Sequence, residues 1–236
     1  MQAILLAGGL GTRLRSVVKD RPKPMAPVND RPFLEYLLHS LTSQGIQDII
    51  FAVGYKGSMI EEYFGNGTFF NADIHYAYEE TLLGTAGAIK NAVPYVKEES
   101  VLVLNADTYY SMEYRKLFSL CETHSYEMAL VLREVADVSR YGEAELRGNE
   151  LVRFNEKTEE SRPGTINGGV YLMRSSLLNE IPNGKVSLEN EIIPKLLRES
   201  RKIGGIINDG YFIDIGVPAD YFRFIEDVKG GVIACG

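Results

Sequence analysis

The sequence predicts an α/β fold, with a doubly wound, mostly parallel mixed sheet and helices on both faces. Short apolar runs alternate with segments of helical spacing over the first 107 residues, which is the order of strands joined by right-handed helical crossovers. Glycines follow the first apolar run directly, as they do at the ligand-binding edge of such sheets. The composition, with 45% hydrophobic and 24% charged residues, is that of a globular protein with a substantial core.

The first half supplies most of the alternation. Apolar runs of about six residues predict buried strands, and leucines three and four residues apart predict a helix that Gly45 ends. The predicted strands are 2–7, 48–53, 74–78 and 101–105, and the predicted helices are 33–41, 59–64 and 85–93.

The second half has fewer long helices. Its predicted strands are 128–133, 144–146, 151–155 and 165–173, and its predicted helices are 188–197 and 221–228. We therefore expect one domain over residues 1–236, in which a Rossmann-like nucleotide-binding half (about 1–110) and a mixed half (about 111–236) share one sheet.

Charge and cysteine content exclude several classes of protein. The net charge of −7 and the pI of about 5.2 argue against a general nucleic-acid binder. No apolar run has the roughly 18 to 20 residues that a membrane span needs, and the first residues do not form a secretory leader. Cys121 and Cys235 fit neither a metal site nor a disulfide framework, so we expect a cytoplasmic protein with no membrane partner.

A basic segment opens this acidic chain. Residues 1–31 contain six basic and two acidic side chains. All eight lie in the glycine- and proline-rich stretch 8–32, and long irregular loops inside compact domains are usually functional. This pattern predicts a local anion-binding site.

Three kinds of phosphate-binding loop compete as interpretations of the glycines at 8, 9 and 11. A Walker A loop would need Gly-Lys-Ser/Thr, but Thr12 and Arg13 follow Gly11. A dinucleotide fingerprint would need glycine in place of Leu14 and an immediate helix, which the prolines that follow disfavour. The third kind is a triphosphate cradle that takes its cations, Arg13 and Lys23, from within the loop. We favour the third.

The chain resembles the sugar-1-phosphate nucleotidyltransferases, and within them most resembles the D-glycero-α-D-manno-heptose 1-phosphate guanylyltransferases. Six blocks carry the resemblance in the family's order and span nearly the whole chain. They are Leu-Ala-Gly-Gly-Leu-Gly-Thr-Arg-Leu at 6–14 with Arg-Pro-Lys-Pro-Met at 21–25, Leu-Gly-Thr-Ala-Gly-Ala at 83–88, Asn-Ala-Asp at 105–107, Phe-Asn-Glu-Lys at 154–157, Asn-Gly-Gly-Val-Tyr at 167–171 and Phe-Ile-Asp-Ile-Gly at 212–216.

The resemblance implies transfer of a nucleoside monophosphate from an NTP to a sugar 1-phosphate, with release of pyrophosphate. The attacking phosphate oxygen is already anionic, so no general base is needed, and catalysis consists of positioning and charge stabilisation. Asp107 and Asp214 each follow an apolar stretch, where two carboxylates could share one Mg²⁺ with phosphates. The implied catalytic residues are Arg13, Lys23, Asp107, Lys157 and Asp214, and the implied metal ligands are Asp107 and Asp214.

The same resemblance divides the binding residues between the two halves. Glu79 and Glu80 lean towards guanine, because carboxylates accept well from its N1 and N2 donors. The expected nucleotide-binding residues are Leu6, Ala7, Gly8, Gly9, Gly11, Thr12, Arg13, Lys23, Glu79, Glu80, Gly84, Thr85, Ala86 and Asp107. The expected sugar-binding residues are Asn105, Glu156, Lys157, Asn167, Gly168 and Gly169.

GTP and the heptose 1-phosphate are the substrates that the resemblance favours, with a role in polysaccharide or capsule synthesis. Uridylyl or thymidylyl transfer, mannose-1-phosphate guanylyl transfer and a non-catalytic nucleotide-sugar sensor are the alternatives. A sensor would not need a metal site together with two phosphate-binding cations. The resemblance is also compatible with a homodimer.

Overall fold

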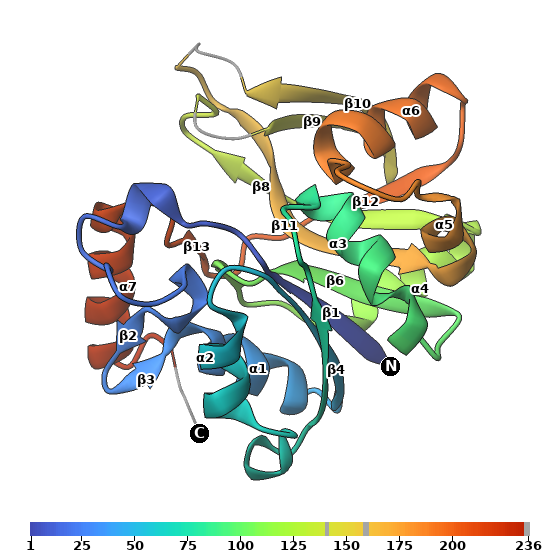
Figure 1. Ribbon diagram of the computed structural model, residues 1–236. Helices are drawn as coiled ribbons and strands as arrows, with labels where there is room; N and C mark the ends of the chain where they lie inside the picture. Colours follow the sequence, from blue (N-terminus) through green and yellow to red (C-terminus); the bar gives the residue numbers. More distant parts are fainter. Residues whose placement is uncertain (140–141, 158–160, 234–236) are drawn as a thin grey trace.

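A nine-stranded mixed sheet runs through the molecule, with helices on both faces (Figure 1). The computed structural model describes residues 1–139, 142–157 and 161–233, without the side chains of Glu156 and Lys157. The strands of the sheet, in spatial order, are β5 (Asp73–Tyr78), β4 (Asp48–Val53), β1 (Gln2–Ala7), β6 (Ser100–Asn105), β11 (Gly164–Arg174), β8 (Met128–Val135), β12 (Ile203–Ile207), β10 (Glu150–Lys157) and β9 (Gly142–Arg147).

The mixed α/β class is confirmed, and the parallel arrangement is concentrated in the first half. Strands β5, β4, β1 and β6 are parallel, and β12 is parallel to β8. The remaining neighbours are antiparallel, beginning where β11 joins β6. Parallel order follows the helical crossovers, and the second half, with fewer of them, reverses its strands.

Two hydrophobic cores separate the helices by face. One face of the sheet packs against α1 (Phe33–Thr42), α2 (Gly57–Phe64), α4 (Arg115–His124) and α7 (Pro218–Lys229). The other packs against α3 (Gly84–Ala92), α5 (Ser175–Glu180) and α6 (Ile193–Arg198). Strand β1 feeds both cores, because Ala3 and Leu5 point to the first and Ile4 to the second.

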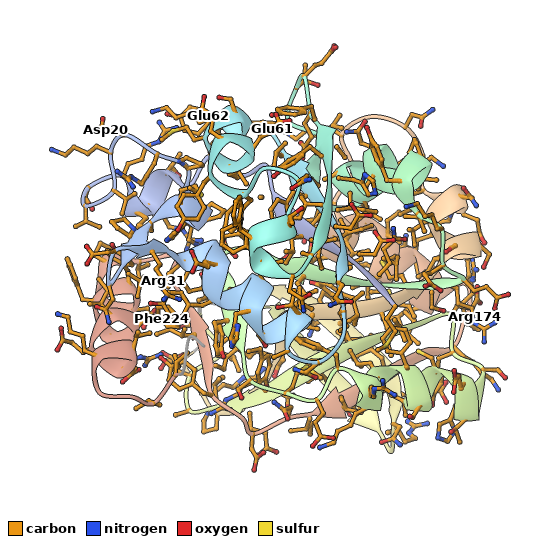
Figure 2. The ribbon with its side chains drawn as sticks, turned by 90° about the horizontal axis from the view of Figure 1, so that it is seen from below. Asp20, Arg31, Glu61, Glu62, Arg174 and Phe224 are labelled. Carbon is orange, nitrogen blue, oxygen red and sulfur yellow. The ribbon has the colours of Figure 1, made fainter. Side chains whose placement is uncertain are left out.

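The last helix is joined to the first. Phe224 of α7, which is labelled in Figure 2, packs edge-on against Phe33 and Tyr36 of α1, with ring centroids 4.8 and 5.5 Å away. The hydroxyl of Tyr221 donates to the carbonyl of Pro27 at the end of the basic loop. The C-terminal helix therefore stabilises the N-terminal loop, which lies between β1 and α1.

Short elements complete the fold. Two two-stranded sheets join β2 (Pro27–Val28) to β3 (Arg31–Pro32), and β7 (Thr108–Tyr110) to β13 (Phe212–Asp214). The 3₁₀ turns are Thr12–Leu14, Lys23–Met25, Thr68–Phe70 and Val93–Tyr95, and Leu188–Ile192 forms a π-helix ahead of α6. Among the described residues, no helix is long and apolar enough to cross a membrane.

Candidate active site

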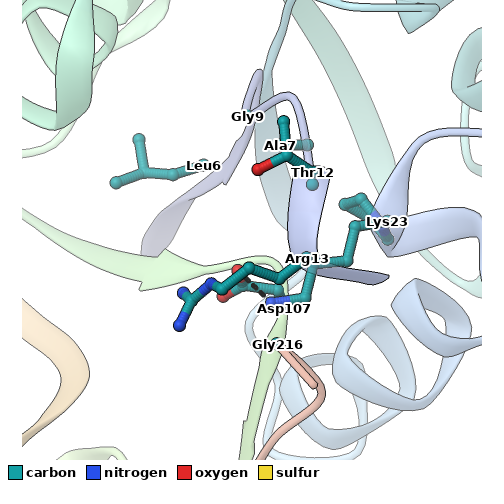
Figure 3. A pocket seen from close by; sticks show the side chains of 10 residues that line it. Leu6, Ala7, Gly9, Thr12, Arg13, Lys23, Asp107 and Gly216 are labelled. Atoms are coloured by element: carbon teal, nitrogen blue, oxygen red, sulfur yellow. Dashed lines mark hydrogen bonds and ion pairs between the residues drawn. The ribbon is translucent and has the colours of Figure 1, made fainter. Parts of the chain in front are cut away.

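Two adjoining cavities lie beyond the carboxyl ends of β1 and β6. One, of about 180 Å³, is enclosed by the glycine-rich loop and the two acid-bearing segments (Figure 3). The other, of about 250 Å³, extends towards β5 and α3. Leu6, Gly9 and Asp107 line both, so the cavities form two parts of one site. The first is lined by Leu6, Ala7, Gly9, Gly11, Thr12, Arg13, Lys23, Pro24, Asp107 and Gly216, and the second by Leu6, Gly8, Gly9, Glu79, Leu82, Gly84, Thr85, Ala88, Asn105 and Asp107.

The glycine-rich loop folds back onto its own lysine. Gly11 has a φ of 57°, and a Cβ there would lie 2.9 Å from the Cβ of Lys23. The close approach and the left-handed backbone both favour glycine. The turn Thr12–Leu14 follows, and Leu14 is buried in the core, which fixes the loop at this point.

Lys23 joins the two carboxylates that the sequence predicts to meet. Its Nζ donates to Asp107 Oδ2 at 2.7 Å and to Asp214 Oδ1 at 3.1 Å, and Lys23 is only 9% exposed. The two acids are brought together by the β7–β13 pair, in which Asp214 lies opposite Thr108. The Ile215 amide also donates to the Asp107 carbonyl, so both acids have a fixed backbone.

Gly216 holds one of the two acids through its backbone amide. In the sequence it stood out only as the last residue of a motif. Its amide donates to Asp214 Oδ1 at 2.7 Å. A Cβ at position 216 would lie 2.9 Å from that oxygen and 3.2 Å from Lys23 Nζ. Glycine is therefore required by the close packing of the charged groups.

The two loop cations have different surroundings. Lys23 is paired with both carboxylates, whereas Arg13 is exposed and has no hydrogen bond or ion pair with any described residue. In Figure 3 the Arg13 side chain is extended beside Asp107, with its guanidinium group pointing away from Lys23. Arg13 is thus available to an anion in the cavity, and Lys23 also organises the acids.

The acid pair suits a divalent ion that is shared with a substrate. Among the described residues, no group of three or more His, Cys, Asp or Glu side chains is arranged to hold a metal. Asp107 lines the smaller cavity and is joined to Asp214 through Lys23. Two carboxylates in this arrangement match the way Mg²⁺ is usually held, by one or two acids together with substrate phosphates and water. Asp107 and Asp214 are the residues that would hold such an ion.

Of the two neighbouring glutamates, only Glu79 lines a cavity. Its Oε2 accepts from the Leu83 amide at 3.1 Å, and its carboxylate lies against Gly8, where a Cβ would come within 3.0 Å of its Cδ. Burial raises the pKa of Glu79, and the hydrogen bond from Leu83 opposes the shift. Glu80 is exposed and lines neither cavity, so the structure does not bring it to the site with Glu79.

The turn at the start of α3 is held from the second half of the chain. Gly84 and Thr85 line the larger cavity, but the amide of buried Ala86 already donates to the Val186 carbonyl. Thr85 Oγ1 donates to Glu189 Oε2 at 2.6 Å and accepts from the Leu188 amide at 2.8 Å.

The predicted sugar-binding loop approaches the site from β11. Gly169 has a φ of 71°, and a Cβ there would lie 2.7 Å from Asn105 Nδ2. The Gly169 amide donates to Asn167 Oδ1, and Gly168 packs on the ring of Tyr110. Asn105, Asn167, Gly168 and Gly169 therefore lie close together, and their expected sugar-binding role stays a prediction. The side chains of Glu156 and Lys157, at the end of β10, lie outside the described residues.

Glu189 and Tyr171 are polar neighbours of the site that the sequence did not single out. Tyr171 is the last residue of the Asn-Gly-Gly-Val-Tyr motif at 167–171, but the sequence indicates no partner for its hydroxyl. Glu189 belonged to an ordinary amphipathic segment. No local pattern indicates that the two side chains meet, because Tyr171 and Glu189 are in different elements.

Comparisons with known proteins identify the family of the chain. The model of the family described as nucleotidyl transferase matches residues 2–230. The chain is 42% identical over 230 residues to a D-glycero-alpha-D-manno-heptose 1-phosphate guanylyltransferase of Aneurinibacillus thermoaerophilus, covering 97% of this chain and 99% of that one. A protein of the same name from Campylobacter jejuni is 42% identical over 229 residues, covering 95% and 99%. The crystal structure of HddC from Yersinia pseudotuberculosis complexed with GMP-PN is 34% identical, with a TM-score of 0.85 and coverage of 96% and 99%.

Proposed function

Because this chain belongs to the nucleotidyl transferase family, we propose that it transfers GMP from GTP to D-glycero-α-D-manno-heptose 1-phosphate. The products are the GDP-sugar and pyrophosphate. The observation that carries the proposal is the joining of Asp107 and Asp214 through Lys23 at the rim of the glycine-loop cavity. The names of the full-length relatives support the choice of GTP and heptose 1-phosphate.

The reaction is an in-line displacement at the α-phosphorus of GTP. An oxygen of the sugar phosphate forms the new P–O bond, the bond between the α-phosphorus and the α,β-bridging oxygen breaks, and pyrophosphate leaves with that electron pair. The nucleophile is already anionic, so the chain needs no general base. Its task is to bring two anions together and to stabilise the negative charge.

Each cation has a separate task in this proposal. Arg13 binds the triphosphate, for which its exposed guanidinium group is suited. Lys23 keeps Asp107 and Asp214 together and contributes positive charge beside the α-phosphate. Nucleotidyl transferases of this kind generally use a divalent metal, and we propose Mg²⁺ held by the two carboxylates. The bound ion would neutralise phosphate charge and fix the geometry of the displacement.

The guanine base lies in the larger cavity, between the backbone of Leu6 to Gly9 and the start of α3. Glu79 is the acceptor for the guanine N1 and N2 donors, because its carboxylate lines this cavity beside Gly8. The sugar phosphate lies nearer the second half of the chain. Asn105, Asn167 and the Gly168–Gly169 backbone face its sugar, and Glu156 and Lys157 contribute from the end of β10.

The division of tasks between the two halves, the cellular location and the oligomeric state are further parts of the proposal. The nucleotide-binding task of residues 1–110 and the sugar-binding task of 111–236 are proposals. A cytoplasmic location and a homodimer are also predictions, and sedimentation analysis tests the dimer.

Pyrophosphate release tests the function directly. The purified chain is assayed with four NTPs against heptose, mannose and glucose 1-phosphates, with and without Mg²⁺. We expect release with GTP and the heptose 1-phosphate only when Mg²⁺ is present. Release with UTP or dTTP and glucose 1-phosphate would overturn the guanine assignment and keep the chemistry. No release from any pair would overturn the catalytic proposal.

A further inference from the structure

We propose that Glu189 is a positioning residue that links the nucleotide-binding turn to the sugar-binding loop. Through this link, a disturbance on one side of the site changes the binding of the substrate on the other. The inference rests on the proposed function for the location of the two subsites. It adds a residue that touches neither substrate.

The carboxylate of Glu189 accepts hydrogen bonds from two sides. Its Oε2 accepts from Thr85 Oγ1 at 2.6 Å, and its Oε1 accepts from the hydroxyl of Tyr171 at 2.9 Å. Thr85 lies in the first turn of α3, the helix that follows β5, and it lines the larger cavity. Tyr171 lies on β11, and three strands of the sheet, β4, β1 and β6, separate β11 from β5. One side chain therefore joins two parts of the chain that are far apart in sequence.

The connection continues from Tyr171 to the glycines of the sugar-binding loop. Asn167 Nδ2 donates to the Tyr171 hydroxyl at 2.6 Å, and Asn167 Oδ1 accepts from the Gly169 amide at 3.1 Å. Because Tyr171 gives its proton to Glu189, its oxygen is free to accept from Asn167. That orientation fixes the amide of Asn167, which in turn holds the left-handed turn at Gly169.

The nucleotide side is ordered in the same way. Thr85 Oγ1 accepts from the Leu188 amide at 2.8 Å and gives its own proton to Glu189. The Glu189 carboxylate is thus the acceptor at which both hydroxyl chains end. Replacing a charged acceptor weakens each bond that it receives, and bonds to charged groups are the stronger ones.

The local backbone favours a positioning task over a simple surface one. Leu188–Ile192 is a π-helix, a rare conformation that is frequent at functional sites. Ser187 Oγ caps it by accepting from the Asn190 amide, and Leu188 is fully buried. The wide turn directs Glu189 inward to Thr85 and Tyr171, while Glu191 of the same turn is exposed and accepts from the Ser187 amide at 2.8 Å.

The test asks whether each subsite responds to a change in the other. Thr85→Val and Tyr171→Phe remove one hydroxyl each, from the nucleotide side and from the sugar side. We expect Thr85→Val to raise the KM for the sugar phosphate as well as for GTP, and Tyr171→Phe to raise the KM for GTP as well as for the sugar phosphate. In Glu189→Gln, both KM values rise about fivefold or more, which is the lower range of energetic coupling between sites.

Double variants separate positioning from loss of fold. If Glu189 transmits the effect, adding Thr85→Val or Tyr171→Phe to Glu189→Gln changes the KM of the remote substrate little further, because the link is already broken. Glu191→Gln is the matched control, since it removes a charge from the same turn and leaves the link intact. We expect it to keep both KM values.

Two results would overturn the inference. In one, each hydroxyl variant affects only the KM of its own substrate, and its effect adds in full to that of Glu189→Gln. In the other, Glu189→Gln lowers the melting temperature or kcat and leaves both KM values unchanged. The assays use whichever substrate pair the wild type accepts, so a wrong base or sugar leaves the test intact. If the wild type accepts no pair, the proposed function has failed, and the link is tested by calorimetry instead. The affinity for GTP or UTP is measured for Thr85→Val, Tyr171→Phe and Glu189→Gln. Tyr171→Phe decides the question, because an unchanged nucleotide affinity in this variant would show that no link exists.

Discussion

At the level of single residues, one buried lysine is shared between the two acids of the site. Lys23 is almost fully buried, and its ammonium lies between Asp107 and Asp214. A buried cation is tolerated because two carboxylates and the surrounding dipoles replace its hydration. Asp107 lies in the turn just before β7 and Asp214 ends β13, so the cluster exists only after the β7–β13 pair has formed.

Replacement of Asp107 by asparagine should reduce turnover much more than nucleotide binding. The variant keeps the shape of the side chain but removes half of the acid pair, so we expect kcat to fall about a hundredfold or more. The Kd for GTP, measured by calorimetry, should change less than the turnover. Asp73→Asn, at the exposed start of β5, is the control. Turnover near the wild-type rate in Asp107→Asn would remove Asp107 from the metal site.

The raised pKa of Glu79 predicts a pH-dependent use of GTP. Burial stabilises the protonated form, and a protonated carboxyl group cannot accept from both guanine donors. The KM for GTP should therefore rise as the pH falls towards the raised pKa, at a higher pH than for a glutamate of ordinary pKa 4.5. Initial rates across pH measure this effect.

Glu79→Gln should abolish that pH dependence and raise the KM for GTP throughout. The same change at Glu80, which is exposed and outside both cavities, distinguishes the two acids. Equal effects at the two positions would show that Glu80 belongs to the base site. An unchanged pH profile in Glu79→Gln would contradict the assignment of Glu79.

At the scale of elements, the sequence predicted best where an element carries its own pattern. The apolar runs of β1, β4 and β6 and the leucine spacing of α1 were sufficient. Strand β12 was missed, because Ile-Gly-Gly-Ile-Ile contains two glycines, which are poor strand formers. The helix α4 was also missed, since few of its residues are buried and charged or polar residues surround them in the sequence.

The two glycines of β12 have a packing reason that only the fold reveals. A Cβ at Gly204 would lie 2.4 Å from the ring of Tyr126, and one at Gly205 would lie 2.7 Å from Leu146. Sequence patterns cannot show such tertiary contacts. The same limit applies to Glu189, whose partners lie on α3 and β11. Asp107 and Asp214 differ, because each follows an apolar stretch within a motif of the resemblance.

Gly204→Ala should therefore destabilise the fold without changing the chemistry. Overpacking of a core typically costs about 1–3 kcal/mol, and each kcal/mol lowers the melting temperature of a chain of this size by roughly 2–4 °C. Calorimetry measures the shift. Gly9→Ala, whose added methyl group meets no atom within 4 Å, is the stability control. An unchanged melting temperature in Gly204→Ala would contradict the close packing of β12 on Tyr126.

In the whole molecule, one sheet brings the two proposed substrate subsites next to each other. Strand β1 ends at the glycine loop and β6 ends just before Asp107, while β11 brings the proposed sugar-binding loop alongside β6. The antiparallel joining of β11 to β6 is thus what places Asn167 and Gly169 beside Asn105. The sequence predicted that both halves share a sheet, but the order of the second-half strands depends on long-range pairing that no local pattern specifies.

The most direct test of the account follows the oxygens of the sugar phosphate through the reaction. The chain is given GTP, Mg²⁺ and heptose 1-phosphate whose phosphate oxygens carry ¹⁸O, and the products are analysed by mass spectrometry. We expect GDP-heptose to carry the label, pyrophosphate to be unlabelled, and both products to be lost without the divalent ion. Labelled pyrophosphate, or GTP consumption without a GDP-sugar, would contradict attack by the sugar phosphate on the α-phosphorus of GTP.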